Sequence, residues 1–242
     1  MQIFEHSARF YDAIYTARKS YGDEAERLCA FIATARGNVP ARTLLDVACG
    51  TGEHLTYLRQ HFEVTGSDLS PFMLAEARRK LPDVPFHQMN MCELELDRSF
   101  DVVTCLFSAV GYLDGERDLR QAVQRMAAHL EPGGVLVIEP ALAPDQVRPA
   151  QVSSVAVDVQ GAHVTRLTSA EHLGGVLSVR FEYTVTDGAG ERCFVEGHPM
   201  QLFRRETYMA ALHDAGLEAA SDETGLSGIG LFWGVRSRPA TA

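Results

Sequence analysis

The sequence predicts an α/β fold with a doubly wound, mostly parallel sheet that carries an inserted antiparallel β meander. Strand-like and helix-like segments alternate between residues 43 and 140, as they do in βαβ units. The apolar strand at 44–47 runs into a turn that contains Gly50 and Gly52, and a helical pattern follows that turn. After Pro140, apolar and polar residues alternate between glycine-containing turns, which is typical of antiparallel strands.

Each element is predicted from a local signal. Residues 5–36 show helical 3–4 spacing, with Tyr11 and Tyr15 on one aromatic face. Ser70 is predicted as an N-cap, with Pro71 in the first helical turn. The sequence predicts further helices at 53–60, 73–80, 118–130 and 204–215, main-sheet strands at 63–69, 84–88, 100–107, 135–138, 217–221 and 230–236, and meander strands at 152–159, 163–170, 176–186 and 192–203.

The composition predicts a folded protein that binds neither nucleic acid nor a membrane. Of its 242 residues, 46% are hydrophobic, which is enough for a sizeable core, and the net charge of −10 argues against a nucleic-acid backbone as the main partner. No basic run favours an anionic membrane surface, no apolar stretch has the length of a span, and the N-terminus shows no signal-peptide pattern. The five cysteines are odd in number and none are paired at metal-binding spacing. We therefore expect reduced thiols, no metal site and a cytoplasmic location.

The carboxyl ends of the predicted parallel strands should form one ligand-binding crevice. In open α/β sheets, ligands bind at this edge because the strands all end there. The strand ends in this chain are Cys49–Gly52, Asp68, Asn90–Met91, Phe107–Ser108 and Glu139. Five separate segments of the chain are thus expected to converge on one site.

The residues at these strand ends favour a ligand with a ribose and no phosphate. The pattern Gly50-x-Gly52-x-x-Leu55 fails the dinucleotide fingerprint at its third position, and no Gly-Lys-Ser/Thr follows that would make a P-loop. A carboxylate at Asp68 can accept hydrogen bonds from both ribose hydroxyls. S-adenosylmethionine (SAM) is such a ligand. A plain tight turn, or core packing of nearby methionines, remains the alternative for each residue alone.

The order of these motifs resembles the class I SAM-dependent methyltransferases, with their Rossmann-like sheet. The resemblance covers roughly residues 43–140 and rests on the run from Asp46 to Gly52, then Asp68, Asn90-Met91, 101–107 and Pro132-Gly133-Gly134. It implies that SAM is the cofactor. It also implies a cofactor site made of Tyr15, Asp46, Ala48, Cys49, Gly50, Gly52, Asp68, Leu69, Met73, Asn90, Met91, Phe107 and Ser108.

A closer resemblance runs nearly end to end. Phe10-Tyr11-Asp12-x-x-Tyr15, Arg18-Lys19-x-Tyr21, Val-Thr-Cys-x-Phe-Ser and Gly-Leu-Phe-x-Gly-Val-Arg occur together with the SAM motifs. This set is similar to the N-methyltransferases that dimethylate amino-deoxysugars attached to thymidine diphosphate (TDP) in antibiotic pathways. The resemblance implies a TDP-linked amino-sugar acceptor and two successive methylations.

Candidates for the acceptor site come from the lid, the loops and the meander. We expect catalytic roles for Tyr11, Tyr112, Glu139 and His198, and acceptor binding by Arg18, Lys19, Tyr21, Glu196 and Arg204. Tyr112 stands where related sugar enzymes often have His, which leaves the proton acceptor open. The alternatives are a core stripe for Tyr11, a loop aromatic for Tyr112, solvated edge residues for Glu196 and His198, and surface charge for Arg204.

The domain organisation follows from the change of rhythm at Pro140. We expect residues 1–140 and 201–236 to form the SAM-binding core with an N-terminal helical lid, and 141–200 to form a β insertion for acceptor binding, dimerisation or both. Exposed strand edges seek cover, which favours a homodimer. Two alternative functions stay open: methylation of another small-molecule amine or hydroxyl, and a non-catalytic nucleotide-binding module.

Overall fold

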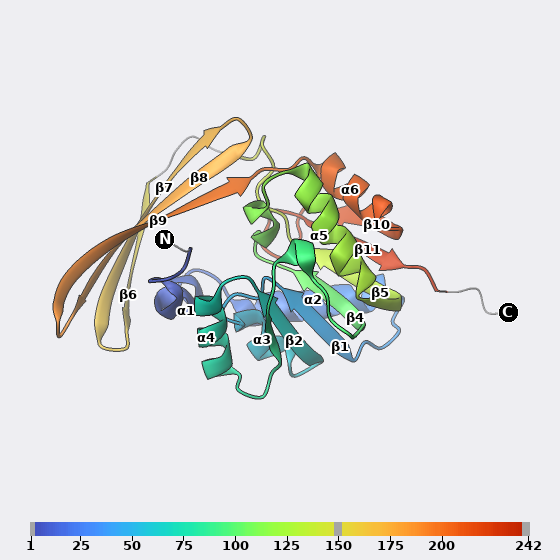
Figure 1. Ribbon diagram of the computed structural model, residues 1–242, viewed down its shortest axis with the longest axis horizontal. Coiled ribbons are helices and arrows are strands. Elements are labelled where there is room, and N and C mark those ends of the chain that lie inside the picture. The colour runs from blue at the N-terminus through green and yellow to red at the C-terminus, as the bar shows by residue number, and fades with distance from the viewer. Residues whose placement is uncertain (1–2, 148–151, 239–242) are drawn as a thin grey trace.

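The structure is a computed structural model that describes residues 3–147 and 152–238. A seven-stranded sheet has the order β10-β11-β5-β4-β1-β2-β3, and a separate four-stranded sheet, β6-β7-β8-β9, lies to one side of it (Figure 1). The bounds of the elements are α1 Ala8–Thr16, α2 Tyr21–Ala35, β1 Thr43–Val47, α3 Glu53–Leu58, β2 Glu63–Asp68, α4 Pro71–Lys80, β3 Phe86–Gln88, η1 Met91–Glu93, β4 Phe100–Cys105, η2 Ala109–Tyr112, α5 Glu116–Ala128, β5 Leu130–Ile138, β6 Ser153–Val159, β7 Ala162–Leu173, β8 Val176–Asp187, β9 Gly190–Gln201, α6 Arg205–Asp214, β10 Leu217–Asp222 and β11 Leu231–Arg236.

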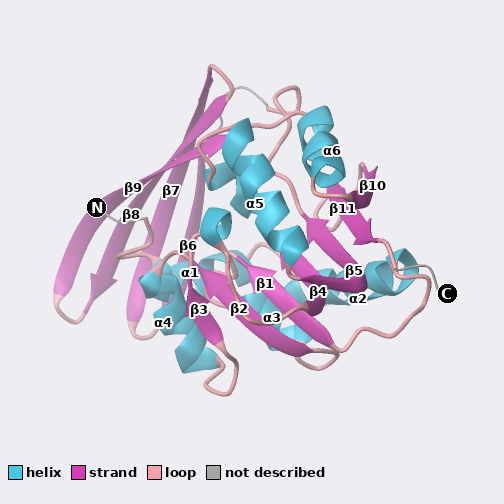
Figure 2. Ribbon diagram, turned by 45° about the vertical axis from the view of Figure 1, so that its right-hand side comes forward, coloured by secondary structure: helices cyan, strands magenta, loops and turns pink. Residues whose placement is uncertain are grey.

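The main sheet is doubly wound and mostly parallel, as the sequence predicts. Strands β3, β2, β1, β4 and β5 pair in parallel in that order. Strand β11 pairs antiparallel with both β5 and β10. One apolar core lies between the sheet and α5 and α6, and a second lies between the sheet and α2 and α3 (Figure 2). Because both faces are covered, the central strands read as continuous apolar runs.

Local signals set most of the element ends. The Ser70 hydroxyl accepts the backbone N–H of Met73, so the predicted cap of α4 is confirmed. The strand predicted from residue 135 begins earlier, at Leu130, and α5 ends at Ala128. The 3₁₀ helices η1 and η2 were not predicted, since such short turns carry no periodic pattern.

The meander is connected to the carboxyl edge of the main sheet. Strands β6 to β9 pair antiparallel in chain order, between the end of β5 and the start of α6. The inner face of this sheet packs against α1, where Phe10 and Ile14 meet Val164, Tyr183 and Val185. The insertion therefore lies beside the strand ends where the ligand-binding crevice is expected, to the left of the main sheet in Figure 1.

The helices of the described chain include none with both the length and the apolar character needed for a membrane crossing.

Candidate active site

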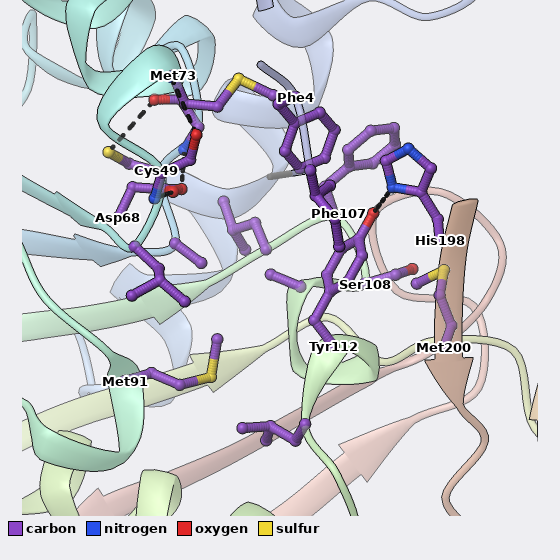
Figure 3. Close-up of a pocket in the computed structure, with 18 of the residues that line it drawn as sticks. Phe4, Cys49, Asp68, Met73, Met91, Phe107, Ser108, Tyr112, His198 and Met200 are labelled. Carbon is purple, nitrogen blue, oxygen red and sulfur yellow. Dashed lines mark hydrogen bonds between the residues drawn. The ribbon is translucent and has the colours of Figure 1, made fainter. Parts of the chain in front are cut away.

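A cavity of about 930 Å³ lies between the carboxyl edge of the main sheet and the inner face of the meander. Figure 3 shows the residues that line it, from Cys49 and Asp68 on one side to His198 and Met200 on the other. Most of the predicted site residues are brought together there: Tyr11, Tyr15, Tyr21, Asp46, Ala48, Cys49, Gly50, Asp68, Leu69, Met73, Asn90, Met91, Phe107, Ser108, Tyr112 and His198.

We call the side formed by strand ends the donor wall; it comprises Asp46, Ala48–Thr51, Asp68–Pro71, Met73 and Asn90–Met91. The acceptor wall is the side formed by Phe4, Tyr11, Tyr112, Leu177, Val179, His198 and Met200. The two walls face one another across the cavity, and Figure 3 draws Phe107 and Ser108 on the acceptor side, beside Tyr112 and His198.

The glycine turn of the donor wall has left-handed backbone at several positions. The φ angles of Ala48, Gly50 and Gly52 are 57°, 56° and 73°. A Cβ on Gly50 would meet no atom within 4 Å, so this glycine faces open cavity. Gly52 does not line the cavity, because a Cβ there would point at Ala77, Leu81 and Phe86 instead. Gly52 therefore packs at the start of α3, and its expected contact with the cofactor stays a prediction.

Asp68 ties the glycine turn to the end of β2. One carboxylate oxygen accepts the Gly50 N–H at 2.8 Å, and the other accepts the Ser70 N–H at 2.7 Å. Burial raises the pKa of Asp68, although these backbone hydrogen bonds favour its ionised form. Each oxygen keeps a further lone pair, so the carboxylate can still accept hydrogen bonds from hydroxyl groups in the cavity.

Asp46 lies at the base of the donor wall. The register of β1 and β4 pairs it with Thr104, whose hydroxyl donates to its carboxylate at 2.7 Å. Asp46 is 2% exposed, and burial raises its pKa to about 6. A cation in the cavity would favour the ionised form.

The far end of the donor wall is an apolar slot. Leu69 is 62% exposed and lines the cavity together with Met73 and Met91. The Asn90 side-chain oxygen accepts the N–H of Cys92 at 2.9 Å, which caps η1 and fixes the slot's edge. Flat apolar walls with one fixed amide suit an adenine ring.

Glu139 supports the site from behind and does not face the cavity, so its expected catalytic contact is wrong. It is fully buried, and one oxygen accepts the Phe107 N–H at 2.7 Å while the other accepts the Ser227 hydroxyl at 2.5 Å. Phe107 and Ser108 have φ angles of 54° and 62°, which are unfavourable for residues with a Cβ. Glu139 therefore holds a strained turn at the centre of the site.

A Tyr–His pair stands on the acceptor wall. The Tyr112 hydroxyl lies 2.8 Å from Nδ1 of His198, as the dashed line in Figure 3 marks. His198 and Glu196 are 1% and 2% exposed, so the interpretation of these residues as a solvated edge is wrong. Glu196 lies behind the wall, where it accepts the Ser7 hydroxyl at 2.6 Å, rather than in the cavity.

Aromatic rings of the N-terminal segment cover the cavity. The ring centroids of Tyr11 and Tyr15 are 4.4 Å apart, and that of Phe4 is 5.0 Å from His198. The Asp12 carboxylate accepts a hydrogen bond from the Thr51 hydroxyl, which connects α1 to the glycine turn. The core-stripe alternative for Tyr11 is wrong, since Tyr11 and Tyr15 face the cavity while the other face of α1 packs on the meander.

The basic residues expected to bind the acceptor do not line the cavity, and their contact with the acceptor stays a prediction. Arg18 and Arg204 are exposed, and neither lines the cavity. The Lys19 ammonium pairs with Glu24 at 2.7 Å and lies 3.7 Å above the ring of Phe107, outside the cavity. Their charge suggested a diphosphate site, but charge alone does not say where a side chain points.

Sequence reasoning missed the apolar part of the acceptor wall. Leu177 and Val179 of β8 and Met200 of β9 line the cavity. Alternation along a strand could have found them, because residues two apart in a strand lie on the same face. Met200 is two residues from His198, and Leu177 is two residues from Val179, which pairs with His198. Phe4 carries no such signal, since it lies in a turn with a φ of 68°.

The chain is similar to known enzymes over nearly its whole length. Residues 44–134 match the family described as Methyltransferase domain. The sequence is 40% identical to the dTDP-3-amino-3,4,6-trideoxy-alpha-D-glucopyranose N,N-dimethyltransferase of Streptomyces venezuelae, over 94% of this chain and 97% of that protein. It is 39% identical to the dTDP-3-amino-3,6-dideoxy-alpha-D-glucopyranose N,N-dimethyltransferase of Streptomyces fradiae, over 94% of this chain and 90% of that protein. The chain belongs to this family of sugar N-methyltransferases.

Solved structures of the family share the fold of this methyltransferase. DesVI of Streptomyces venezuelae superposes with a TM-score of 0.89 at 38% identity, over 96% of this chain and 99% of that chain. SAM-bound CalS10, an amino pentose methyltransferase from Micromonospora echinaspora involved in calicheamicin biosynthesis, superposes with a TM-score of 0.83 at 41% identity, over 94% and 97%. The chain is thus a SAM-dependent methyltransferase, which excludes the non-catalytic module.

Proposed function

We propose that this methyltransferase methylates, twice in succession, the amino group of a TDP-linked amino-deoxysugar in antibiotic biosynthesis. The observation that carries the proposal is the single cavity in which strand ends suited to SAM face a wall of tyrosine, histidine and apolar side chains. The two relatives described above are dimethyltransferases of dTDP-linked amino-deoxysugars, which supports the same class of acceptor.

The donor wall fits SAM. Gly50 leaves room for a close ligand, Asp68 offers carboxylate oxygens to the ribose hydroxyls, and Asp46 suits the ammonium group at the amino-acid end. When bound, SAM supplies a methyl group whose bond to sulfur breaks, leaving the electron pair on sulfur, as the acceptor nitrogen forms the new bond to carbon. The chain's contribution is to hold nitrogen, carbon and sulfur in line, which is where most of the acceleration arises.

The acceptor wall fits a deoxysugar amine. Leu177, Val179 and Met200 offer apolar surface to ring carbons that lack hydroxyls, and the Tyr112 hydroxyl can accept a hydrogen bond from an amine. Burial raises the pKa of Tyr11 well above its usual range, so this tyrosine stays a neutral donor beside the cavity.

The charge of the cavity supports a diphosphate bound outside it. No Lys or Arg occurs among the described residues that line the cavity. The acidic lining residues are Asp46, Glu53, Asp68, Asp114 and Asp118. This field favours a cationic cofactor and an amine inside, and we propose that the diphosphate and thymidine extend outward.

The test is incubation of the protein with SAM and TDP-linked amino-deoxysugars, followed by mass spectrometry. Mass gains of one and then two methyl groups on nitrogen are expected. No gain with any amino-sugar nucleotide would overturn the proposal. An O-methyl product, or methylation of a different small-molecule amine alone, would instead support the alternative acceptor.

We also propose that the insertion supports a homodimer as well as acceptor binding. Strands β6 and β9 are the outer strands of the meander sheet, and Leu167 and Leu173 of β7 are 39% and 85% exposed. Sedimentation should give twice the mass of one chain. A monomer at all concentrations would contradict this part of the proposal.

A further inference from the structure

We propose that Tyr112, His198 and Glu196 form a relay that takes the proton from the acceptor nitrogen between the two methyl transfers. This inference rests on the proposed function, because it requires a nitrogen that is methylated in the cavity. It assigns the proton acceptor, which neither the sequence motifs nor the family resemblance identify in this chain.

A second methylation needs a proton to leave the nitrogen. When the lone pair of a primary amine forms the new C–N bond, the nitrogen becomes positive and keeps both of its protons. The thioether that leaves is neutral and takes no proton. The secondary ammonium has no lone pair, so it cannot be methylated again until one proton moves to a base.

Three side chains stand in the order that such a transfer requires. The Tyr112 hydroxyl borders the cavity and lies 2.8 Å from Nδ1 of His198. On the other side of the ring, Nε2 lies 3.6 Å from a carboxylate oxygen of Glu196. The Ser7 hydroxyl holds that same oxygen at 2.6 Å. The path therefore leads from the cavity to a buried carboxylate.

The inner half of the path is incomplete as it stands. Nε2 of His198 and Oε1 of Glu196 are buried and have no hydrogen-bond partner among the residues that the structure describes, and their ring and carboxylate, 3.6 Å apart at the nearest pair of atoms, are too far apart for a hydrogen bond. Buried polar atoms without partners are costly and call for a reason. Protonation of the imidazole supplies such a reason, because an imidazolium attracts a carboxylate. The His198 ring and the Glu196 carboxylate can then approach to hydrogen-bond distance.

The charges around the ring set the direction of transfer. The carboxylate beside Nε2 favours a proton on that nitrogen, which leaves Nδ1 free to accept from Tyr112. Arg166 lies 4.3 Å above the ring of Phe181, which is itself 4.7 Å from the His198 ring. This cation opposes an imidazolium, so Glu196 is needed to offset it.

Tyr112 and Glu196 have protonation states that suit these roles. Burial raises the pKa of the Tyr112 phenol, so it does not become a phenolate and can only receive one proton as it gives up its own. Burial alone would raise the pKa of Glu196, but the neighbouring His198 and Ser7 groups hold it below its usual range. The carboxylate stays ionised and stabilises the proton on His198.

The first experiment uses His198→Asn, whose amide can accept a hydrogen bond from Tyr112 but cannot take a proton. We expect the second methylation of a TDP-amino-deoxysugar to slow about a hundredfold at neutral pH, so that monomethylated product accumulates. Raising the pH should restore dimethylation, because solvent can then remove the proton. A purely structural role would not be rescued by pH.

His163→Asn is the matched control. The His163 ring on β7 also has a carboxylate beside it, that of Asp158 at 2.8 Å, but the His163 side chain is 56% exposed and does not line the cavity. The control should give the wild-type ratio of products. SAM binding by calorimetry should be unchanged in both variants. A wild-type product ratio from His198→Asn at neutral pH would overturn the relay.

Tyr112→Phe tests the relay at a second residue, because it removes the hydroxyl that contacts His198. Because both residues act in one path, the double variant Tyr112→Phe/His198→Asn should be no slower than the slower single variant. Fully additive losses would mean that the two residues act separately and would overturn the relay.

The protonation of the His198 ring can be measured without turnover. Nitrogen NMR of the imidazole rings, with the His198 signal assigned by its loss in His198→Asn, should show neutral His198 protonated on Nε2. A proton on Nδ1 would overturn the relay, since that nitrogen could not then accept from Tyr112. If wild-type protein methylates no amino-sugar nucleotide, the proposed function fails, whereas an active wild-type enzyme whose His198 carries its proton on Nδ1 would overturn the relay alone.

Discussion

The donor wall of the cavity is shaped by backbone and by a few carboxylates, whereas the acceptor wall is made almost entirely of side chains. In the donor wall, Asp68 fixes the turn at Gly50 through backbone N–H groups, and neighbouring parallel strands hold every part in register. In the acceptor wall, Phe4, Tyr112 and His198 come from a terminal turn, a 3₁₀ helix and the meander. A cofactor shared by many enzymes can thus be held by a constant frame while the acceptor contacts vary.

This difference predicts that substitutions in the two walls change different quantities. Donor-wall changes should weaken SAM binding, and acceptor-wall changes should alter turnover or acceptor affinity without affecting SAM.

Asp68→Ala should weaken SAM binding by about a hundredfold or more. The substitution removes the acceptor of two backbone hydrogen bonds and the carboxylate offered to the ribose, each a contact of roughly 1.5–3 kcal/mol when a charge is involved. Calorimetry with SAM measures the loss. Asp83→Ala, an exposed carboxylate in the loop before β3, is the control and should bind as wild type does. Equal affinities in the two variants would contradict the assigned ribose site.

SAM binding should weaken as the pH falls below about 6, by up to tenfold per unit. Burial raises the pKa of Asp46 to about 6, so below that value the group is mostly neutral and must lose a proton to pair with the ammonium group of SAM. Above pH 7 the carboxylate is already ionised and the affinity should level off. Calorimetry in buffers of different ionisation enthalpy should detect proton release near pH 6. Asp46→Asn should abolish that release, and its persistence there would assign it to another group.

Tyr11→Phe should lower turnover about tenfold while leaving SAM affinity and the melting temperature near wild type. The change removes only a hydroxyl, whose hydrogen bond to the acceptor would contribute roughly 0.5–1.5 kcal/mol. Steady-state rates and calorimetry give the two readouts. An unchanged rate would remove Tyr11 from the acceptor wall, and a loss of SAM affinity would break the separation of the walls.

Leu177→Ala should raise the KM for the sugar nucleotide about fivefold with little change in the rate at saturation. The substitution removes apolar contact worth roughly 1 kcal/mol from the meander side of the cavity. Leu173→Ala is a matched control on the same sheet, since Leu173 is 85% exposed at the end of β7 and lies outside the cavity. Equal effects of both changes would argue against the meander as acceptor wall.

The same difference explains what the sequence could predict. Donor-wall residues could be predicted because parallel strands end at one edge and the motif from Asp46 to Gly52 is continuous. Position at a strand end does not give side-chain direction, so Glu139 was expected in the cavity although it faces Phe107 and Ser227.

The acceptor wall could be predicted only in part, because its residues are distant in sequence. Tyr112 and His198 were both expected near the acceptor, but their contact depends on how the meander folds back over η2. Arg18 and Arg204 were selected by charge, and the fold leaves both on the surface. Phe4 reaches the site through a left-handed turn that no periodic pattern announces.

The most direct test is a crystal structure with S-adenosylhomocysteine and a TDP-linked amino-deoxysugar bound together. The ribose hydroxyls should contact Asp68, and the sugar nitrogen should lie within hydrogen-bond distance of the Tyr112 hydroxyl, pointing at the sulfur. The diphosphate should leave through the mouth of the cavity. A sugar nitrogen bound away from Tyr112 and His198, or a ribose held by residues other than Asp68, would contradict the division into donor and acceptor walls.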